Sequence, residues 1–309
     1  MSRTHPTLAV PDPNRTLNVI THDGATIRLR QHGRAGAPRL VLSHGNGLAI
    51  DAYLPFWGPL CDRYEVVVFD FRNHGQNPLH TLEGHHWQNF IGDMELLFQT
   101  IQREFGAAPT AGVFHSLSAV TATLHSLRYD HRWRLLVLVD PPFYPRDGHP
   151  LLFSQHSDKN SLAERALRRT ERYKTVEELA HQFATRAQFR RWIPGAAGLM
   201  AHATLRRDDQ GGGWTLACPR EYEAKIFSSN ANSELWSRLG QLEVPVKLVC
   251  GDPEIDDVMP PALIGRAIAE EHSIEYEAIP DTTHFLQIER PAECIRAVES
   301  FLRAQHFIG

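Results

Sequence analysis

Short runs of consecutive apolar residues, separated by stretches with helical spacing, recur along most of this chain. We expect these runs to be strands, at residues 40–43, 65–69, 110–114, 135–139, 247–250 and 274–279. A run without polar alternation is typical of a strand that is buried on both faces, and such strands form parallel sheets covered by helices. The pattern therefore predicts an α/β fold built on a mostly parallel, doubly wound sheet.

The N-terminal part of the chain predicts a different kind of pairing. Residues 16–21 and 26–31 alternate apolar and polar side chains around Asp23-Gly24, a two-residue turn typical of β-hairpins. We therefore expect the sheet to begin with an antiparallel hairpin. Apolar residues at helical spacing predict helices over 90–105, 118–127, 261–271 and 291–304.

The rhythm of strands and helices breaks between residues 139 and 247. Amphipathic helical patterns cover 161–173, 175–192, 221–227 and 234–239, and we expect no strand there. The chain is thus predicted to have a core of residues 1–142 and 240–309, interrupted by a helical cap of residues 143–239. The cap should lie over the carboxyl ends of the strands, where ligands bind in open α/β sheets.

Charge, cysteine content and hydropathy argue against several classes of protein. The net charge of −4, without a basic run that includes aromatic residues, is not typical of nucleic-acid binding. The four cysteines, at 61, 218, 250 and 294, lack CxxC spacing and are typical of reduced thiols. The chain has no run of eighteen apolar residues and no apolar N-terminal signal segment. We expect a cytoplasmic protein without a membrane span.

Four short motifs each follow a predicted strand and should therefore share one edge of the sheet. They are His44-Gly45-Asn46-Gly47, residues 70–75, His115-Ser116-Leu117, and residues 280–285, which include His284. A serine on a sharp strand-to-helix turn has the geometry of an acyl-transfer nucleophile, because backbone N–H groups of the helix lie beside its hydroxyl. The glycine-containing turn after the first buried strand can direct N–H groups at a negative oxygen.

With these motifs in this order, the sequence resembles the α/β-hydrolases that carry a helical cap. The resemblance runs from His44-Gly45 to the C-terminal helix, and nearly the whole chain takes part in it. It implies that Ser116 is the nucleophile and His284 its general base, with the N–H groups of Asn46 and Leu117 as the oxyanion hole. Within the family, residues 44–46, 70–75 and 213–227 resemble small-molecule esterases and lipase-like members.

The serine turn departs from the family pattern at one position. Phe114 stands two residues before Ser116, where the family has a small residue, whereas Ser118 two residues after it is small. If Ser118 were the nucleophile, Val120 would occupy the second small position and the usual His-Ser pair would be lost. We therefore favour Ser116, and expect Phe114 to open the turn slightly or to form an aromatic wall beside the nucleophile.

The acid that orients His284 has candidates at two places in the chain. The family's usual Gly-x-x-Asp loop is two residues longer here, so counting from Gly251 selects Glu254 and counting back from Pro260 selects Asp256. Some family members place the acid at the end of the sixth strand, where Asp140 ends a buried run. We favour Asp140 and keep Asp256 as its rival.

The remaining candidate residues are histidines and aromatics. The eighteen histidines show no spacing typical of metal ligands, so we expect neither a metal nor a cofactor. Aromatic residues that flank the motifs or fall in the cap, Phe143 and Trp192 among them, are predicted to line an apolar acyl pocket.

We therefore expect a serine hydrolase that cleaves a carboxylic ester or lactone with an apolar acyl part through an acyl-enzyme. A carbon–carbon hydrolase of a β-diketone or ring-fission product uses the same three residues and stays an alternative. A second alternative is a ligand-binding relative that has no catalytic turnover. The expected partner is a small-molecule substrate, and the sequence does not indicate an oligomeric state.

Overall fold

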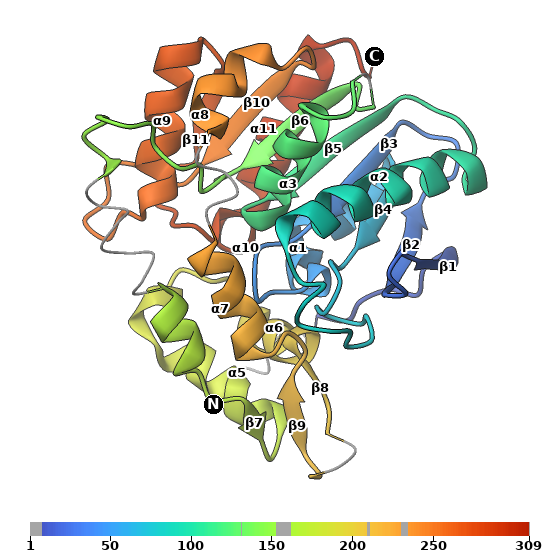
Figure 1. Cartoon of the computed structure of the whole chain (residues 1–309), viewed down its shortest axis with the longest axis vertical. Coiled ribbons are helices and arrows are strands. Elements are labelled where there is room, and N and C mark those ends of the chain that lie inside the picture. Colours follow the sequence, from blue (N-terminus) through green and yellow to red (C-terminus); the bar gives the residue numbers. More distant parts are fainter. Residues whose placement is uncertain (1–7, 131, 153–161, 209–210, 230–233, 309) are drawn as a thin grey trace.

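The protein is built around one large, mostly parallel sheet (Figure 1). The computed structural model describes residues 8–130, 132–152, 162–208, 211–229 and 234–308. The eight strands lie in the order β1-β2-β4-β3-β5-β6-β10-β11. Their bounds are β1 Arg15–Ile20, β2 Thr26–Gly33, β3 Arg39–Ser43, β4 Glu65–Phe69, β5 Thr110–His115, β6 Leu135–Val139, β10 Val246–Cys250 and β11 Glu275–Ala278.

The pairing of the strands confirms the predicted mixed sheet. β1 pairs antiparallel with β2, and β2 antiparallel with β4, whereas every pair from β4 to β11 is parallel. β3, β4, β5 and β6 are buried along their whole length. Their continuous apolar runs follow from this position, because helices cover both faces.

Successive side chains of a central strand enter opposite cores. Val137 of β6 belongs to the core that includes α1 (Leu54–Trp57) and α11 (Pro291–Ala304). Its neighbours Leu136 and Leu138 belong to the core on the other face. That face is covered by α2 (Trp87–Glu104), α3 (Leu117–Ser126) and α9 (Pro260–His272). The sheet is therefore doubly wound, as the sequence predicts.

The connections between strands include short helical turns that the sequence pattern does not predict. Between β3 and β4 these turns are η1 (Ile50–Tyr53), α1 and η2 (Gly58–Asp62). A fourth, α10 (Leu286–Glu289), follows the segment that carries His284. Helices of three to five residues are too short to display an apolar period, so only packing against the sheet defines them.

Residues 143–239, which we call the insertion, leave the large sheet after β6 and return to it before β10 (Figure 1). Residues 162–167 are helical. The insertion also contains α5 Val176–Thr185, η3 Ala187–Phe189, α6 Ala196–Thr204, α7 Arg220–Ser228 and α8 Leu235–Arg238, while η4 Leu239–Gln241 crosses its end.

The expectation of an insertion without strands is wrong. β7 (Arg172–Tyr173), β9 (Trp214–Leu216) and β8 (Leu205–Arg207) form a small antiparallel sheet in that order. Strands of two or three residues are too short to show an alternating pattern. The helix predicted over residues 161–173 therefore runs past the helical residues 162–167 and includes β7. Likewise the predicted helix over 175–192 ends at Thr185 and gives way to η3.

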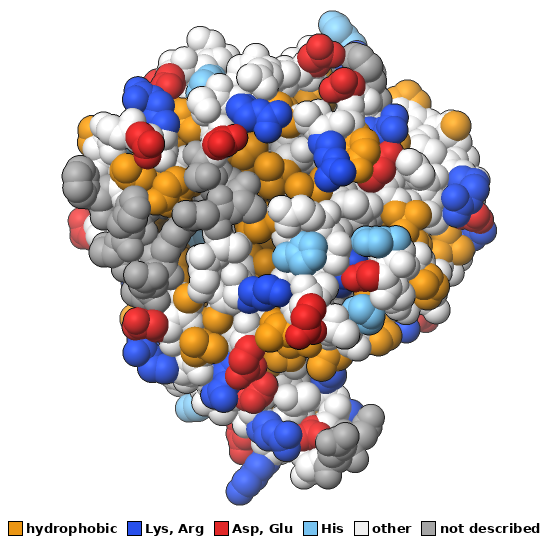
Figure 2. All heavy atoms as spheres, viewed as in Figure 1, with side chains coloured by type: hydrophobic (Ala, Val, Ile, Leu, Met, Phe, Trp, Pro, Cys, Tyr) orange, Lys and Arg blue, Asp and Glu red, His pale blue; other side chains and the backbone are white. Residues whose placement is uncertain are grey.

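The surface shows acidic and basic side chains interspersed over the face seen in Figure 2, without a large field of one sign among the described residues there. Among the same residues, no helix combines the length and the hydropathy that crossing a bilayer requires.

Candidate active site

Ser116 occupies a sharp turn between β5 and α3. Its backbone φ is 53°, in the left-handed region that side chains with a Cβ disfavour. Its N–H donates to the Val139 carbonyl at 3.0 Å, which ties the turn to the end of β6. The residue is 8% exposed, and α3 begins at the next position, Leu117. The turn is therefore strained and fixed by the neighbouring strand.

Phe114 does not form an aromatic wall beside Ser116. It is fully buried, and its ring packs against Trp133 with centroids 5.2 Å apart. Gly112 makes room for it, because a Cβ there would lie 2.4 Å from the Phe114 ring. Residues two apart in a strand share a face, so the missing side chain at Gly112 leaves the space that the Phe114 ring fills.

Ser118 has a structural position. It is fully buried, and its hydroxyl accepts the His115 N–H and donates to the His115 carbonyl, both at 2.8 Å. The hydroxyl closes the serine turn locally and makes no bond to His284. The structure thus separates the two serines, and Ser116 is the one beside His284.

Asp140, His284 and Ser116 form a continuous hydrogen-bond chain. His284 Nδ1 lies 2.5 Å from Asp140 Oδ2, and His284 Nε2 lies 2.9 Å from Ser116 Oγ. Asp140 is fully buried, and its other oxygen accepts the Gly251 N–H at 3.0 Å. A carboxylate at Nδ1 keeps the proton on that nitrogen, so the Nε2 lone pair faces the serine hydroxyl.

The acidic loop after β10 does not reach His284. Asp256 is exposed, Glu254 pairs with Arg266, and Asp257 pairs with arginines of the insertion. What this loop supplies to the site is the backbone N–H of Gly251, which binds Asp140. The structure therefore brings Asp140 to His284 and leaves the rival Asp256 at the surface.

The turn of residues 44–47, called the glycine turn below, packs directly on the serine turn. A Cβ at Gly45 would lie 3.1 Å from both Ser116 Cβ and His115 Nδ1, so only glycine fits there without displacing its neighbours. Neither the Asn46 N–H nor the Leu117 N–H donates to another described residue. Both amides are thus available to an oxygen bound at Ser116.

A model described as the alpha/beta hydrolase family matches residues 40–297, a span that contains Ser116, Asp140 and His284. The chain belongs to the alpha/beta hydrolase family. No curated protein sequence matches this hydrolase-family chain.

Solved structures similar to this alpha/beta hydrolase include an E-2-(acetamidomethylene)succinate hydrolase, at 18% identity and a TM-score of 0.75, with 94% of this chain and 99% of that chain covered. The thioesterase domain from the curacin biosynthetic pathway is 17% identical, with a TM-score of 0.71 and coverages of 93% and 100%. A thermophilic esterase from Thermogutta terrifontis is 19% identical, with a TM-score of 0.66 and coverages of 94% and 99%. At such identities the likeness concerns the fold.

Tyr53 and His115 were missed by sequence reasoning as members of the site. His115 Nε2 donates to the His284 carbonyl at 2.9 Å, and its Nδ1 accepts the Tyr53 hydroxyl at 2.8 Å. The Tyr53 oxygen in turn lies 3.3 Å from the Gly45 N–H that donates to it. Burial, and then the nearby His284, hold the pKa of His115 well below its ordinary value, so the ring stays neutral. No sequence signal marks Tyr53, because its partners come from distant segments.

The structure places the two predicted substrate-binding aromatic residues in different surroundings. Phe143 is fully buried in the core with α2 and α3, so its prediction as a pocket residue is wrong. Trp192 is half-buried, and its ring packs against Phe189 and Phe285 at centroid distances of 4.5 and 5.3 Å. Because Phe285 follows His284 in the chain, Trp192 belongs to an aromatic group next to the site.

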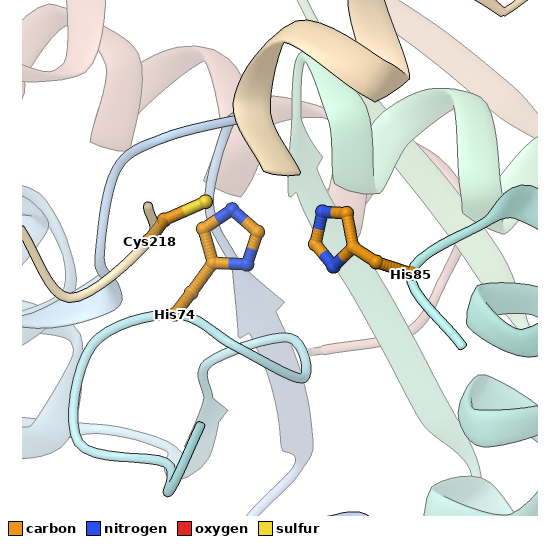
Figure 3. A group of neighbouring side chains, drawn as sticks. All are labelled: His74, His85 and Cys218. Carbon is orange, nitrogen blue, oxygen red and sulfur yellow. The ribbon is translucent and has the colours of Figure 1, made fainter. Parts of the chain in front are cut away.

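Behind the glycine turn, three potential metal ligands lie together. Figure 3 shows His74, His85 and Cys218 facing one another, with ligand atoms within 4.8 Å, and all three are buried. Two imidazoles and a thiolate are a donor set that zinc accepts. Whether they fit an ion depends on where their protons are.

The hydrogen bonds of this cluster do not fit a metal. His74 Nε2 already accepts the Gly47 N–H at 3.1 Å. His85 Nδ1 accepts from the Asn73 amide nitrogen at 3.1 Å, which places the proton on the Nε2 that would have to bind. Burial raises the pKa of the Cys218 thiol far above its ordinary value, so the thiolate is disfavoured. The cluster supports the glycine turn from behind.

Proposed function

We propose that this protein is a serine hydrolase that cleaves carboxylic esters or lactones with an apolar acyl part. The observation that carries the proposal is the chain from Asp140 through His284 to Ser116. Membership of the alpha/beta hydrolase family supports hydrolysis as the reaction class.

In the proposed first half-reaction, Ser116 Oγ attacks the substrate carbonyl carbon while His284 Nε2 takes the hydroxyl proton. Asp140 keeps His284 in the productive tautomer and stabilises the imidazolium that forms. The N–H groups of Asn46 and Leu117 bind the oxyanion, and each such donor is typically worth about 10²- to 10³-fold in rate. His284 then protonates the alcohol as it leaves.

In the second half-reaction, a water molecule attacks the acyl-enzyme. His284 takes the water proton, and the collapse of the second tetrahedral intermediate returns that proton to Ser116. The released carboxylic acid carries the oxygen of the water, and the enzyme is regenerated without a cofactor.

We propose that residues 143–239 act as the cap of the site. The aromatic residues of this insertion support a substrate with an apolar acyl part. The group of Phe183, Phe189, Trp192 and Phe285 joins the insertion to the segment that carries His284. An aromatic surface beside His284 favours an apolar substrate group. It also excludes water from the ion pair that the His284 imidazolium forms with Asp140 during the reaction.

A fluorophosphonate probe combined with a p-nitrophenyl ester series tests the proposal. We expect the wild-type protein to be labelled at Ser116 and to hydrolyse esters, and Ser116→Ala to lose both properties. The matched control is Ser118→Ala, which removes a structural hydroxyl and should keep most turnover. A wild-type protein that is neither labelled nor active would refute the proposal and favour a ligand-binding relative. Labelling without ester turnover, together with cleavage of a vinylogous diketone, would favour a carbon–carbon hydrolase.

A further inference from the structure

Helix α7 of the insertion packs directly against the glycine turn. The Asn46 side-chain amide donates to the backbone carbonyl of Glu223 at 2.9 Å. At Gly47, where φ is +70°, a Cβ would lie 2.6 to 3.0 Å from the Glu223 carboxyl atoms. One residue of α7 therefore contacts two consecutive residues of the turn, through its backbone and through its side chain.

The Glu223 carboxylate has little freedom to move. The residue is 8% exposed, and its carboxylate forms an ion pair with Arg169, which precedes β7 in the insertion. A buried carboxylate is stable only when it is paired, so Arg169 fixes the charge and the position of Glu223 together.

Three further hydrogen bonds attach α7 and the residue after it to core residues outside the glycine turn. The Tyr222 hydroxyl donates to the His80 carbonyl at 2.7 Å, and Lys225 Nζ to the Leu82 carbonyl at 2.6 Å. At the end of the helix, Trp87 Nε1 donates to Ser229 Oγ at 2.6 Å. The seating of the helix and its hold on the turn can therefore be perturbed separately.

We propose that Glu223 is a positioning residue of the oxyanion hole, so that the insertion completes the site that Ser116 serves. The inference rests on the proposed function. The side chain of Asn46 is held by the Glu223 carbonyl, and the next N–H along the chain, that of Gly47, donates to His74 Nε2 at 3.1 Å. Residue 46, which carries the proposed donor, is therefore fixed by its side chain and by the peptide that follows it. Oxyanion donors act because they are oriented before the reaction, so loosening either support weakens the donor without removing it.

Asn46→Ala tests the proposal because it keeps the backbone N–H and removes only the bond to Glu223. We expect kcat to fall by about tenfold or more, part of the loss typical for removing a donor, with KM within about threefold. Glu223→Gln, which removes the negative charge that faces Arg169 while keeping the side-chain size, should act in the same direction and serves as the second variant if Asn46→Ala does not fold. The matched control is Lys225→Met, which loses a bond between α7 and the core but nothing at the turn, and should keep kcat within about threefold.

A trifluoromethyl ketone supplies the readout that a merely structural role would not move. Ser116 Oγ adds to its carbonyl carbon, the hydroxyl proton passes to His284, and the resulting hemiketal oxyanion occupies the proposed hole. Affinity for this ketone should fall in Asn46→Ala in parallel with kcat/KM. Affinity for the corresponding trifluoromethyl alcohol, which has no carbonyl for Ser116 to attack, should not change. The inference is overturned if ketone affinity is unchanged, or if Lys225→Met lowers kcat as much as Asn46→Ala does. If the wild-type protein neither labels nor turns over esters, the proposed function itself fails, and the inference fails with it.

Discussion

Replacing Asp140 by asparagine exchanges one oxygen for an NH₂ group in the hydrogen-bond chain that runs from Asp140 through His284 to Ser116. The hydrogen bonds of Asp140 determine which way the new amide faces. Asp140 Oδ1 accepts the Gly251 N–H and Oδ2 faces His284 Nδ1. In Asp140→Asn the remaining oxygen must stay on Gly251, because an NH₂ group there would meet another donor. The new NH₂ group therefore faces His284 Nδ1 and requires that nitrogen to accept.

The consequence for catalysis follows from the tautomer. With Nδ1 accepting, the proton of His284 lies on Nε2, so a donor faces the Ser116 hydroxyl and the base cannot take its proton. A triad in the wrong tautomer loses about 10⁴-fold in kcat, which corresponds to about 5.5 kcal/mol of activation free energy. The Gly251 bond survives, so we expect the free energy of unfolding to change by less than about 1 kcal/mol.

Steady-state hydrolysis of a short p-nitrophenyl ester by Asp140→Asn measures this loss, with urea unfolding as the check on stability. Asp256→Asn is the matched control, since Asp256 is an exposed carboxylate that does not reach His284. The reasoning is refuted if Asp140→Asn keeps more than about a tenth of the wild-type kcat, or if Asp256→Asn loses activity to a similar extent.

Two further predictions concern the buried surroundings of the site. Tyr53→Phe leaves the His115 Nδ1 acceptor and the Gly45 N–H donor unpaired, so the free energy of unfolding should fall by about 1–3 kcal/mol, with a lower kcat; an unchanged urea midpoint would contradict this. Burial lowers the pKa of His44 to about 4, so the unfolded chain binds this proton more readily than the folded protein. The free energy of unfolding should therefore be highest above pH 6.5 and fall by about 1.4 kcal/mol per pH unit for this histidine between pH 6.5 and 4. Urea titrations at pH 7, 6 and 5 measure the total slope, to which His115 adds in the same direction, and a flat profile would contradict the prediction.

Local patterns in the sequence were enough to predict the strands, the hairpin and the order of the site motifs. The buried runs at β3, β4, β5 and β6 are visible as strands because a strand covered on both faces must be apolar at every position. Parallel strands place their carboxyl ends at one edge, so the order of motifs along the chain already brought Ser116 and His284 together. The N-terminal hairpin followed from Asp23-Gly24, although the loop between β1 and β2 spans residues 21–25 and is longer than the two-residue turn that the sequence predicts.

Which groups from distant segments meet depends on how the elements pack, and no local pattern predicts it. Asp140 and Asp256 are both carboxylates near the ends of neighbouring strands, and only the packed structure shows that Asp140 bonds to His284 whereas Asp256 lies exposed. Phe114 is tolerated because Gly112 vacates the space beside it, and Phe143 turned out to be core. The contact of Glu223 with Asn46 spans 177 positions in the chain, and no periodicity records it. Such contacts are set by how whole elements pack, which a local pattern does not encode.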